Sequence, residues 1–319
     1  QFLTPNSYIK QNTMGTGPYC LVQSDWIKGS QMTLRQNTHF WRSWHGTEPT
    51  TIVMKFTSDP TSRIEAIRSG AADVADLPLA SVSQVTGISG VVAKANATVK
   101  SEIVAMNTTN AYMADNASGR LVRQAFSWAF DYNTTIAQDY AGYAALLPGP
   151  IPNGMQFFDV QHQVYTQNIA RANQLLNSSG YTWPTGGYRF GGTSFRIVAD
   201  GSQVEEANAA RRWQATLGLL GVKSDLLIKP STDAWDTARK NAAYDFFVAH
   251  WVLDYLDADD YVSPMVMNAT NGGDYWHTGF NNLTTNAFGL KARSELTAAA
   301  RASDYTQVFT AAMQTPNRI

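Results

Sequence analysis

Cysteine and charge are both scarce in this sequence. Cys20 is the one cysteine among 319 residues, which excludes an intrachain disulfide and a metal site built from several thiolates. Charged residues make up 15% of the chain, against roughly 25% in an average globular protein. The formal net charge is -1. Without a basic excess the chain lacks the electrostatic footprint of a nucleic-acid-binding protein, so nucleic acid is not an expected partner.

Long apolar runs are also missing. No stretch approaches the roughly 18 consecutive apolar residues of a membrane-spanning helix. The first residues, Gln1 to Pro5, lack the basic and then apolar pattern of an export signal. We therefore expect no direct insertion into a membrane, and we expect any export signal to lie outside this sequence.

The common catalytic signatures do not occur. The sequence has no His-Glu-x-x-His, Gly-x-Ser-x-Gly or P-loop lysine motif, so it predicts no catalytic residue, no cofactor and no enzyme activity. Glu205 and Glu206 could supply glycosidase carboxylates together with Asp254, but adjacent acids that open an amphipathic helix are better explained by the helix dipole. No metal ligand is predicted, and His250 is interpreted as structural, because the histidines lack metal-site spacing. The five histidines are His39, His45, His162, His250 and His277.

Asn-x-Ser/Thr sequons are more frequent than expected. Chance at this Asn, Ser and Thr usage would give roughly half as many. The excess favours a secreted glycoprotein. The seven sequons begin at Asn96, Asn107, Asn116, Asn133, Asn177, Asn268 and Asn282.

The first third of the sequence favours short strands separated by polar turns. Asp59 and Pro60 predict the start of a short helix, which Gly70 ends. The predicted strands are 19–22, 32–35, 52–56, 73–77 and parts of 87–104.

Further along the chain, helices and strands alternate, which predicts an α/β fold with a layered sheet. Three prolines at 148–152 predict an ordered loop. We expect residues 1–103 to form part of a first, strand-rich lobe and residues 104–319 a second, α/β lobe. No closing strand is predicted after the last helix. The predicted helices start near 119, 169, 204, Trp235, 290 and 305, and the predicted strands are 195–199, 223–228 and a run from Asp245.

The stretch from Asp245 to Tyr261 combines an apolar strand with a cluster of acids. A rigid element that delivers aromatic and acidic groups to one place is a common way to build a ligand pocket. The later acids are expected to cap or solvate the helix that begins there. The four carboxylates after the strand are Asp254, Asp257, Asp259 and Asp260.

Several segments occur in an order typical of one known family. They are Gly15-Thr16-Gly17-Pro18-Tyr19; Asp59-Pro60-Thr61-Ser62-Arg63 with Gly70 and Asp73; Leu121-Val122-Arg123-Gln124-Ala125 with Ala129 and Asp131; Pro150-Ile151-Pro152; and Tyr244-Asp245 leading to Trp251 and Asp254. With these segments the chain resembles the family 5 solute-binding proteins of ABC transporters, which include dipeptide, oligopeptide, nickel and oligosaccharide receptors. The resemblance implies an α/β, two-lobed periplasmic-binding-protein-like fold (type II, family 5 or cluster C) with a hinge between the lobes.

The resemblance also implies a function. We expect an extracellular or periplasmic receptor, associated with the cell surface, that captures di- or oligopeptides in an interlobe cleft and delivers them to the permease subunits of an ABC importer. Two alternatives stay open. Nine tryptophans and low charge suit an oligosaccharide receptor of the same family equally well, because flat rings also stack on sugars. The sequons suit an extracellular structural module without transport.

A ligand site follows from the same resemblance. In peptide-binding members the aspartate three residues after the motif tryptophan pairs with the ligand's α-ammonium group, and Asp254 holds this position after Trp251; as alternatives, Asp254 caps the next helix or pairs with an internal arginine. Trp251 and Trp235 match aromatic pocket walls, although either is equally well explained as core. The backbone from His250 to Val252 matches a strand that pairs with an extended ligand. Tyr255 completes the predicted set.

The sequence also departs from the family pattern. Family members are longer, so we expect this chain to lack their N-terminal segment and C-terminal end. Ala258 follows Asp257 where the family commonly has proline, and Tyr132 replaces a frequent arginine after Asp131.

Overall fold

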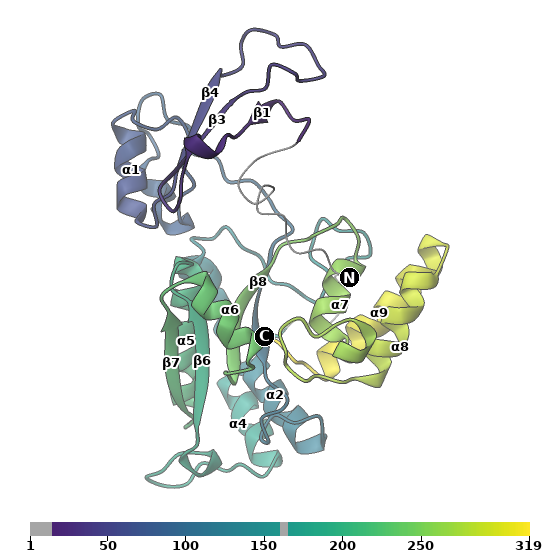
Figure 1. Ribbon diagram of the computed structural model, residues 1–319. Coiled ribbons are helices and arrows are strands. Elements are labelled where there is room, and N and C mark those ends of the chain that lie inside the picture. The colour runs from purple at the N-terminus through teal and green to yellow at the C-terminus, as the bar shows by residue number, and fades with distance from the viewer. Residues whose placement is uncertain (1–14, 160–164) are drawn as a thin grey trace. The chain divides into compact units, whose positions relative to one another are not determined.

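The computed structural model describes residues 15–159 and 165–319, which form two compact units (Figure 1). The first unit contains the described residues up to Leu77 together with Gly87–Val91, and the second contains Pro78–Thr86 and the described residues from Val92 to Ile319. The predicted lobes, 1–103 and 104–319, stay a prediction. No helix in the described ranges combines the length and the apolar character that a membrane crossing requires.

The first unit is a small antiparallel sheet with one helix. β3 pairs with β1 and β2 along one edge and with β4 along the other. Helix α1 begins at Pro60 because the Asp59 carboxylate accepts hydrogen bonds from the backbone nitrogens of Thr61 and Ser62. The elements are β1 (Tyr19–Cys20), β2 (Trp26–Ile27), β3 (Gln31–Gln36), β4 (Thr51–Lys55), a 3-10 turn at Gln23–Asp25 and α1 (Pro60–Arg68).

The second unit is built on a four-stranded sheet in the order β5-β8-β6-β7. β5 runs antiparallel to β8, whereas β6 is parallel to both β7 and β8. The strands are rich in apolar residues because both faces of the sheet are covered. The strands are β5 (Ser101–Met106), β6 (Ser194–Asp200), β7 (Lys223–Lys229) and β8 (Phe246–Trp251).

Alternate residues of these strands enter two separate cores. Val104, Ile197 and Phe246 pack against α2, α4 and α5, whereas Ile103 and Phe247 pack on the opposite face with Trp235 of α6. A third core joins α7, α8 and α9, which lie together beside the sheet (Figure 1). The helices are α2 (Ala117–Ala129), α3 (Tyr132–Thr134), α4 (Ile169–Ser178), α5 (Val204–Leu219), α6 (Thr232–Lys240), α7 (Asp259–Val266), α8 (Leu283–Ser294) and α9 (Ala298–Gln314). Short 3-10 or π turns occupy Leu79–Gln84, Thr135–Asp139, Phe190–Gly192 and Ala269–Asn271.

The predicted α/β alternation is confirmed, with three local differences. Residues 73–77 form no strand. Residues 87–92 form none either, because Gly87 and Gly90 adopt positive φ angles that turn the chain. After α9 the chain does return to the sheet, since the backbone of Ile319 exchanges two hydrogen bonds of 2.9 Å with Val104. The prediction of no closing strand overlooked this pairing.

Several sequon asparagines have structural roles. Asn107 is 3% exposed and its amide donates a hydrogen bond of 2.9 Å to the carbonyl of Tyr244. The side chains of Asn116, Asn268 and Asn282 cap α2, a 3-10 turn and α8. Helix capping therefore gives a structural reason for part of the sequon excess, and a glycan on Asn107 would require its buried contact to break.

Candidate functional site

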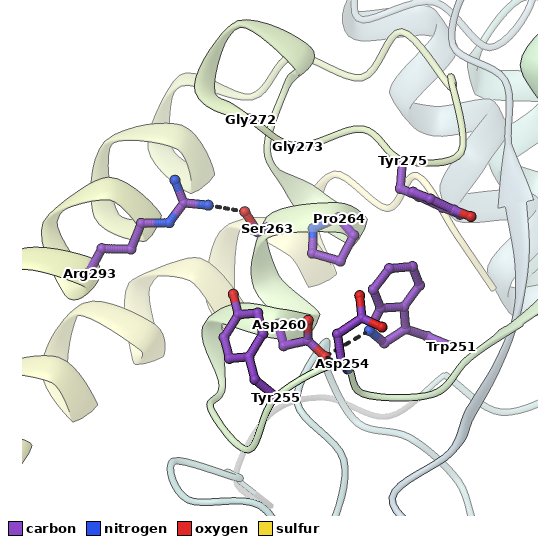
Figure 2. Close-up of a pocket in the computed structure, with 10 residues that line it drawn as sticks. All are labelled: Trp251, Asp254, Tyr255, Asp260, Ser263, Pro264, Gly272, Gly273, Tyr275 and Arg293. Atoms are coloured by element: carbon purple, nitrogen blue, oxygen red, sulfur yellow. Dashed lines mark hydrogen bonds between the residues drawn. The ribbon is translucent and has the colours of Figure 1, made fainter. Parts of the chain in front are cut away.

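A pocket of about 310 Å³ lies where β8 ends and α7 begins (Figure 2). β8 ends at Trp251 and α7 begins at Asp259, so the acidic stretch singled out in the sequence connects the two. Figure 2 shows Arg293 on one side of the pocket and Tyr275 on the other. The lining residues are Trp251, Asp254, Tyr255, Asp260, Ser263, Pro264, Gly272, Gly273, Tyr275 and Arg293.

Asp260 fixes two parts of the pocket at once. It is 4% exposed, and its Oδ2 accepts a hydrogen bond from Trp251 Nε1 at 3.3 Å and another from the backbone nitrogen of Asp254 at 2.8 Å. Asp260 lies in the first turn of α7, where the helix dipole favours a negative charge. One buried carboxylate therefore holds both an aromatic wall and the backbone of the predicted ligand residue.

Asp254 is exposed, and within the described residues its side chain has no hydrogen-bond or ion-pair partner. The N-cap residue of α7 is Ala258, so Asp254 does not cap the next helix. In Figure 2 its carboxylate projects beside the Trp251 ring. The exposed, unpaired carboxylate is therefore accessible to a cationic group of a ligand.

The aromatic wall of the pocket is held by edge-to-face contacts. The Trp251 ring lies 5.0 Å from Tyr275 and 6.0 Å from Trp276, between ring centroids, at interplanar angles of 73° and 82°. The guanidinium carbon of Arg239 lies 4.0 Å from the centroid of the Tyr275 ring. Such pairs favour one relative orientation of the rings, so the aromatic side of the pocket is already ordered before a ligand binds.

The opposite side of the pocket carries a positive charge that is already neutralised. Arg293 Nε donates to Asp259 Oδ1 at 2.7 Å, and its terminal nitrogens donate to the carbonyl of Asn271 and to Ser263 Oγ. The Tyr255 hydroxyl donates to the other oxygen of Asp259 at 3.0 Å. Burial and the Asp259 charge raise the pKa of Tyr255 well above its ordinary value. Arg293 therefore pairs with Asp259 and does not neutralise the charge of Asp254.

The pocket brings together Trp251, Asp254 and Tyr255 from the predicted ligand set. Val252 is 58% exposed and does not line it. Trp235 is 8% exposed in the core, where its Nε1 donates to the carbonyl of Val248 at 3.1 Å. This placement agrees with the core explanation of Trp235, and its contact with a ligand stays a prediction.

His250 lies outside this pocket, on the last part of β8. Its Nδ1 contacts a carboxylate oxygen of Glu206, and it lies directly opposite Glu102 in the antiparallel ladder. Glu205 and Glu206 do occupy the first turn of α5, as the helix-dipole interpretation predicted.

The later acids do lie at the start of α7, but no described side chain caps the helix at its N-cap residue Ala258, and of the three acids only Asp257 bonds to the backbone of its first turn. Asp257 Oδ1 accepts a hydrogen bond of 2.9 Å from the backbone nitrogen of Asp259. Sequence reasoning missed that Asp257 also binds Arg301 with both oxygens, at 2.6 and 3.0 Å. It also missed Tyr275 and Arg293 as pocket residues, because neither lies within the motif that drew attention to the site.

Residues 3–273 match the family model of the bacterial extracellular solute-binding proteins, family 5, in its middle part. The chain belongs to this family. The resemblance drawn from the ordered segments is therefore confirmed. The family consists of bacterial extracellular solute-binding proteins, and the relatives described below are named as binding proteins.

Individual relatives agree with this assignment. The chain is 26% identical over 299 residues to heme-binding protein A of Haemophilus influenzae, covering 90% of this chain and 51% of that protein. It is 25% identical over 257 residues to the probable D,D-dipeptide-binding periplasmic protein DdpA of Escherichia coli, covering 78% of this chain and 45% of that protein. The chain thus spans about half the length of these relatives.

A solved structure shares the fold. The periplasmic binding protein DppA of Helicobacter pylori, in complex with the peptide STSA, superposes with a TM-score of 0.81 at 19% identity, covering 96% of this chain and 56% of that one. The α/β periplasmic-binding-protein fold of family 5 is therefore confirmed.

Proposed function

We propose that this protein is an extracellular receptor that captures peptides and presents them to the permease subunits of an ABC importer. The observation that carries the proposal is the exposed carboxylate of Asp254, which lies beside the Trp251 ring without a partner among the described residues. Two relatives support peptides as the ligand class, since one is named for D,D-dipeptides and the other holds a peptide.

In this proposal Asp254 anchors the α-ammonium group of the ligand. A charge-assisted hydrogen bond between ammonium and carboxylate is roughly twice as strong as a neutral one. Asp260 already fixes the backbone of Asp254, so little order is lost on binding. The nearby cation, Arg293, is bound to Asp259 and does not have to be displaced.

β8 offers the ligand a second means of attachment. β6 pairs with β8 at Phe246 and Phe247, whereas β8 continues to Trp251. The final residues of β8 therefore have an edge that β6 does not use. An extended peptide can form main-chain hydrogen bonds along such an edge whatever its side chains are, which supports the predicted backbone contacts from His250 to Val252.

The amine anchor is tested with Asp254→Asn and two forms of one peptide. Calorimetric titration of the wild-type chain should show that a free-amine peptide binds more than about tenfold more tightly than its N-acetylated form, the scale of one charge-assisted contact. In Asp254→Asn this difference should disappear. Asp225→Asn is the matched control, because Asp225 is an exposed carboxylate on β7, away from the pocket.

Other results would contradict the proposal. An equal preference for the free amine in Asp254→Asn and the wild type would exclude the anchor role of Asp254. Binding of cello- or malto-oligomers in place of peptides would favour the oligosaccharide receptor. Failure to bind either class, together with stable self-association on a sizing column, would favour the structural module.

A further inference from the structure

Three side chains with metal-binding atoms meet at the end of β8 that leads to the pocket. Glu102 of β5 lies opposite His250 of β8 in the antiparallel ladder, and Glu206 projects from the first turn of α5. One ligand atom from each residue lies within 4.8 Å of the other two. Side chains two residues apart in a strand point to the same face of the sheet. Glu102 therefore lies on the same face as Val104, and His250 on the same face as Val248, which is the face that α5 covers.

Two carboxylate oxygens in this group are buried without a partner. The Glu206 side chain is 1% exposed; its Oε1 contacts His250, but its Oε2 has no hydrogen-bond partner. Glu102 Oε2 is likewise buried and unpaired. A buried acceptor without a donor is costly and needs an explanation. Both unpaired atoms belong to the same three-residue group.

The surroundings of the group leave it short of positive charge. Lys100 Nζ lies 2.5 Å from Glu102 Oε1 and offers one charge to the two glutamates. The environment therefore favours the arrival of a further cation.

We propose that Glu102, Glu206 and His250 bind one divalent transition-metal ion. Two carboxylate oxygens and one imidazole nitrogen form a donor set suited to zinc and its neighbours, whereas the imidazole disfavours magnesium and calcium. Metal–ligand bonds of about 2.0–2.2 Å require the three side chains to close slightly around the ion. The ion takes up the unpaired oxygens, and three protein ligands leave a coordination position for water or another donor.

This site uses other atoms than the peptide proposal: none of its three residues lines the pocket, and His250 contributes its backbone to the proposed peptide contacts but its side chain to the metal site. Zinc titration of the metal-stripped full chain, followed by calorimetry, should give one ion per chain. Magnesium should bind at least about 100-fold more weakly. Cobalt should give a visible absorption spectrum that changes when the imidazole ligand is removed in His250→Gln.

The variants separate ligation from general surface binding. Glu102→Gln and His250→Gln should each weaken zinc binding by at least about tenfold, whereas His39→Gln and Glu65→Gln, which alter exposed residues of the first unit, should leave it unchanged. Lys100→Met should tighten zinc binding, because it removes the cation that competes for Glu102. Circular dichroism and the urea midpoint confirm that each variant is folded.

Three outcomes would overturn the site: no zinc uptake by the wild type, unchanged affinity in folded Glu102→Gln and His250→Gln, or equal or weaker zinc binding in Lys100→Met. Peptide affinity in the same samples keeps the two proposals distinguishable, since a wild-type chain that binds peptide but takes up no zinc would reject only the metal site.

Discussion

The buried carboxylate of Asp260 accepts a hydrogen bond from the backbone nitrogen of Asp254 at 2.8 Å. The same oxygen accepts from the indole of Trp251, so the acidic and aromatic parts of the pocket are fixed by one group. Asp260 belongs to α7, so the position of that helix determines the positions of both the Asp254 backbone and the Trp251 ring.

Asp260→Ala should lower both stability and peptide affinity. The change leaves the Asp254 backbone nitrogen and Trp251 Nε1 without their acceptor, which should reduce the free energy of unfolding by about 1–3 kcal/mol. Urea denaturation measures this loss. Asp233→Ala is the control, because Asp233 is the exposed acid in the first turn of α6; an equal loss there would mean that only the helix dipole matters.

Trp235→Phe should reduce stability but leave peptide affinity unchanged. The substitution removes the hydrogen bond to the Val248 carbonyl and part of the volume of a buried ring, for a loss of about 1–3 kcal/mol. Trp41→Phe, at a position that is 67% exposed, should have little effect. A fall in peptide affinity in folded Trp235→Phe would instead support the predicted ligand contact.

Arg123→Met should be among the most damaging single changes in α2. The Arg123 guanidinium is 1% exposed, donates to the carbonyls of Met113, Ala114 and Pro316, and pairs with Asp115. Its removal leaves these groups unpaired and should reduce the free energy of unfolding by about 3 kcal/mol. Arg120→Met, at an exposed position of the same helix, should fall within about 0.5 kcal/mol of the wild type.

The Asp257–Arg301 pair should make stability depend on pH. Burial alone would raise the pKa of Asp257, but the hydrogen bonds from Arg301 and from the Asp259 backbone, with the Arg301 charge, lower it below its ordinary 3.8. A carboxyl whose pKa is lowered on folding stabilises the protein fully above that ordinary value, and the stabilisation is lost as the pH falls through the lowered pKa.

Urea midpoints measured between about pH 6 and about pH 3 test this dependence. The wild type should lose more stability over this interval than Asp257→Asn, in which the titrating group is absent. Asp225→Asn should follow the wild type. Identical slopes for the wild type and Asp257→Asn would show that the pair does not contribute.

Local patterns in the sequence predicted much of the fold. Asp59 followed by Pro60 predicted the start of α1, and the spacing of Val122 and Phe126 predicted the buried face of α2, because caps and helical periodicity act within a few residues. The apolar run before Asp254 predicted β8, because a short apolar run is also a local signal.

The group of Glu102, Glu206 and His250 had no comparable signal. Its members lie on three elements that are distant in the sequence, and only the β5–β8 register and the placement of α5 bring them together. The spacing of the histidines was therefore uninformative. Asp260 was recognised as a helix-start acid, but its bonds to Trp251 and Asp254 depend on how the connection between β8 and α7 folds back.

The pairing of β5 with β8 has a consequence for how the pocket forms during folding. Residues 101–106 must find residues 246–251, with most of the second unit between them, and such distant contacts form slowly because a large loop has to close first. Neighbouring helices such as α8 and α9 contact one another over a short loop and can form earlier. The pocket at the end of β8 should therefore be among the last parts of the second unit to gain protection against amide hydrogen exchange during refolding.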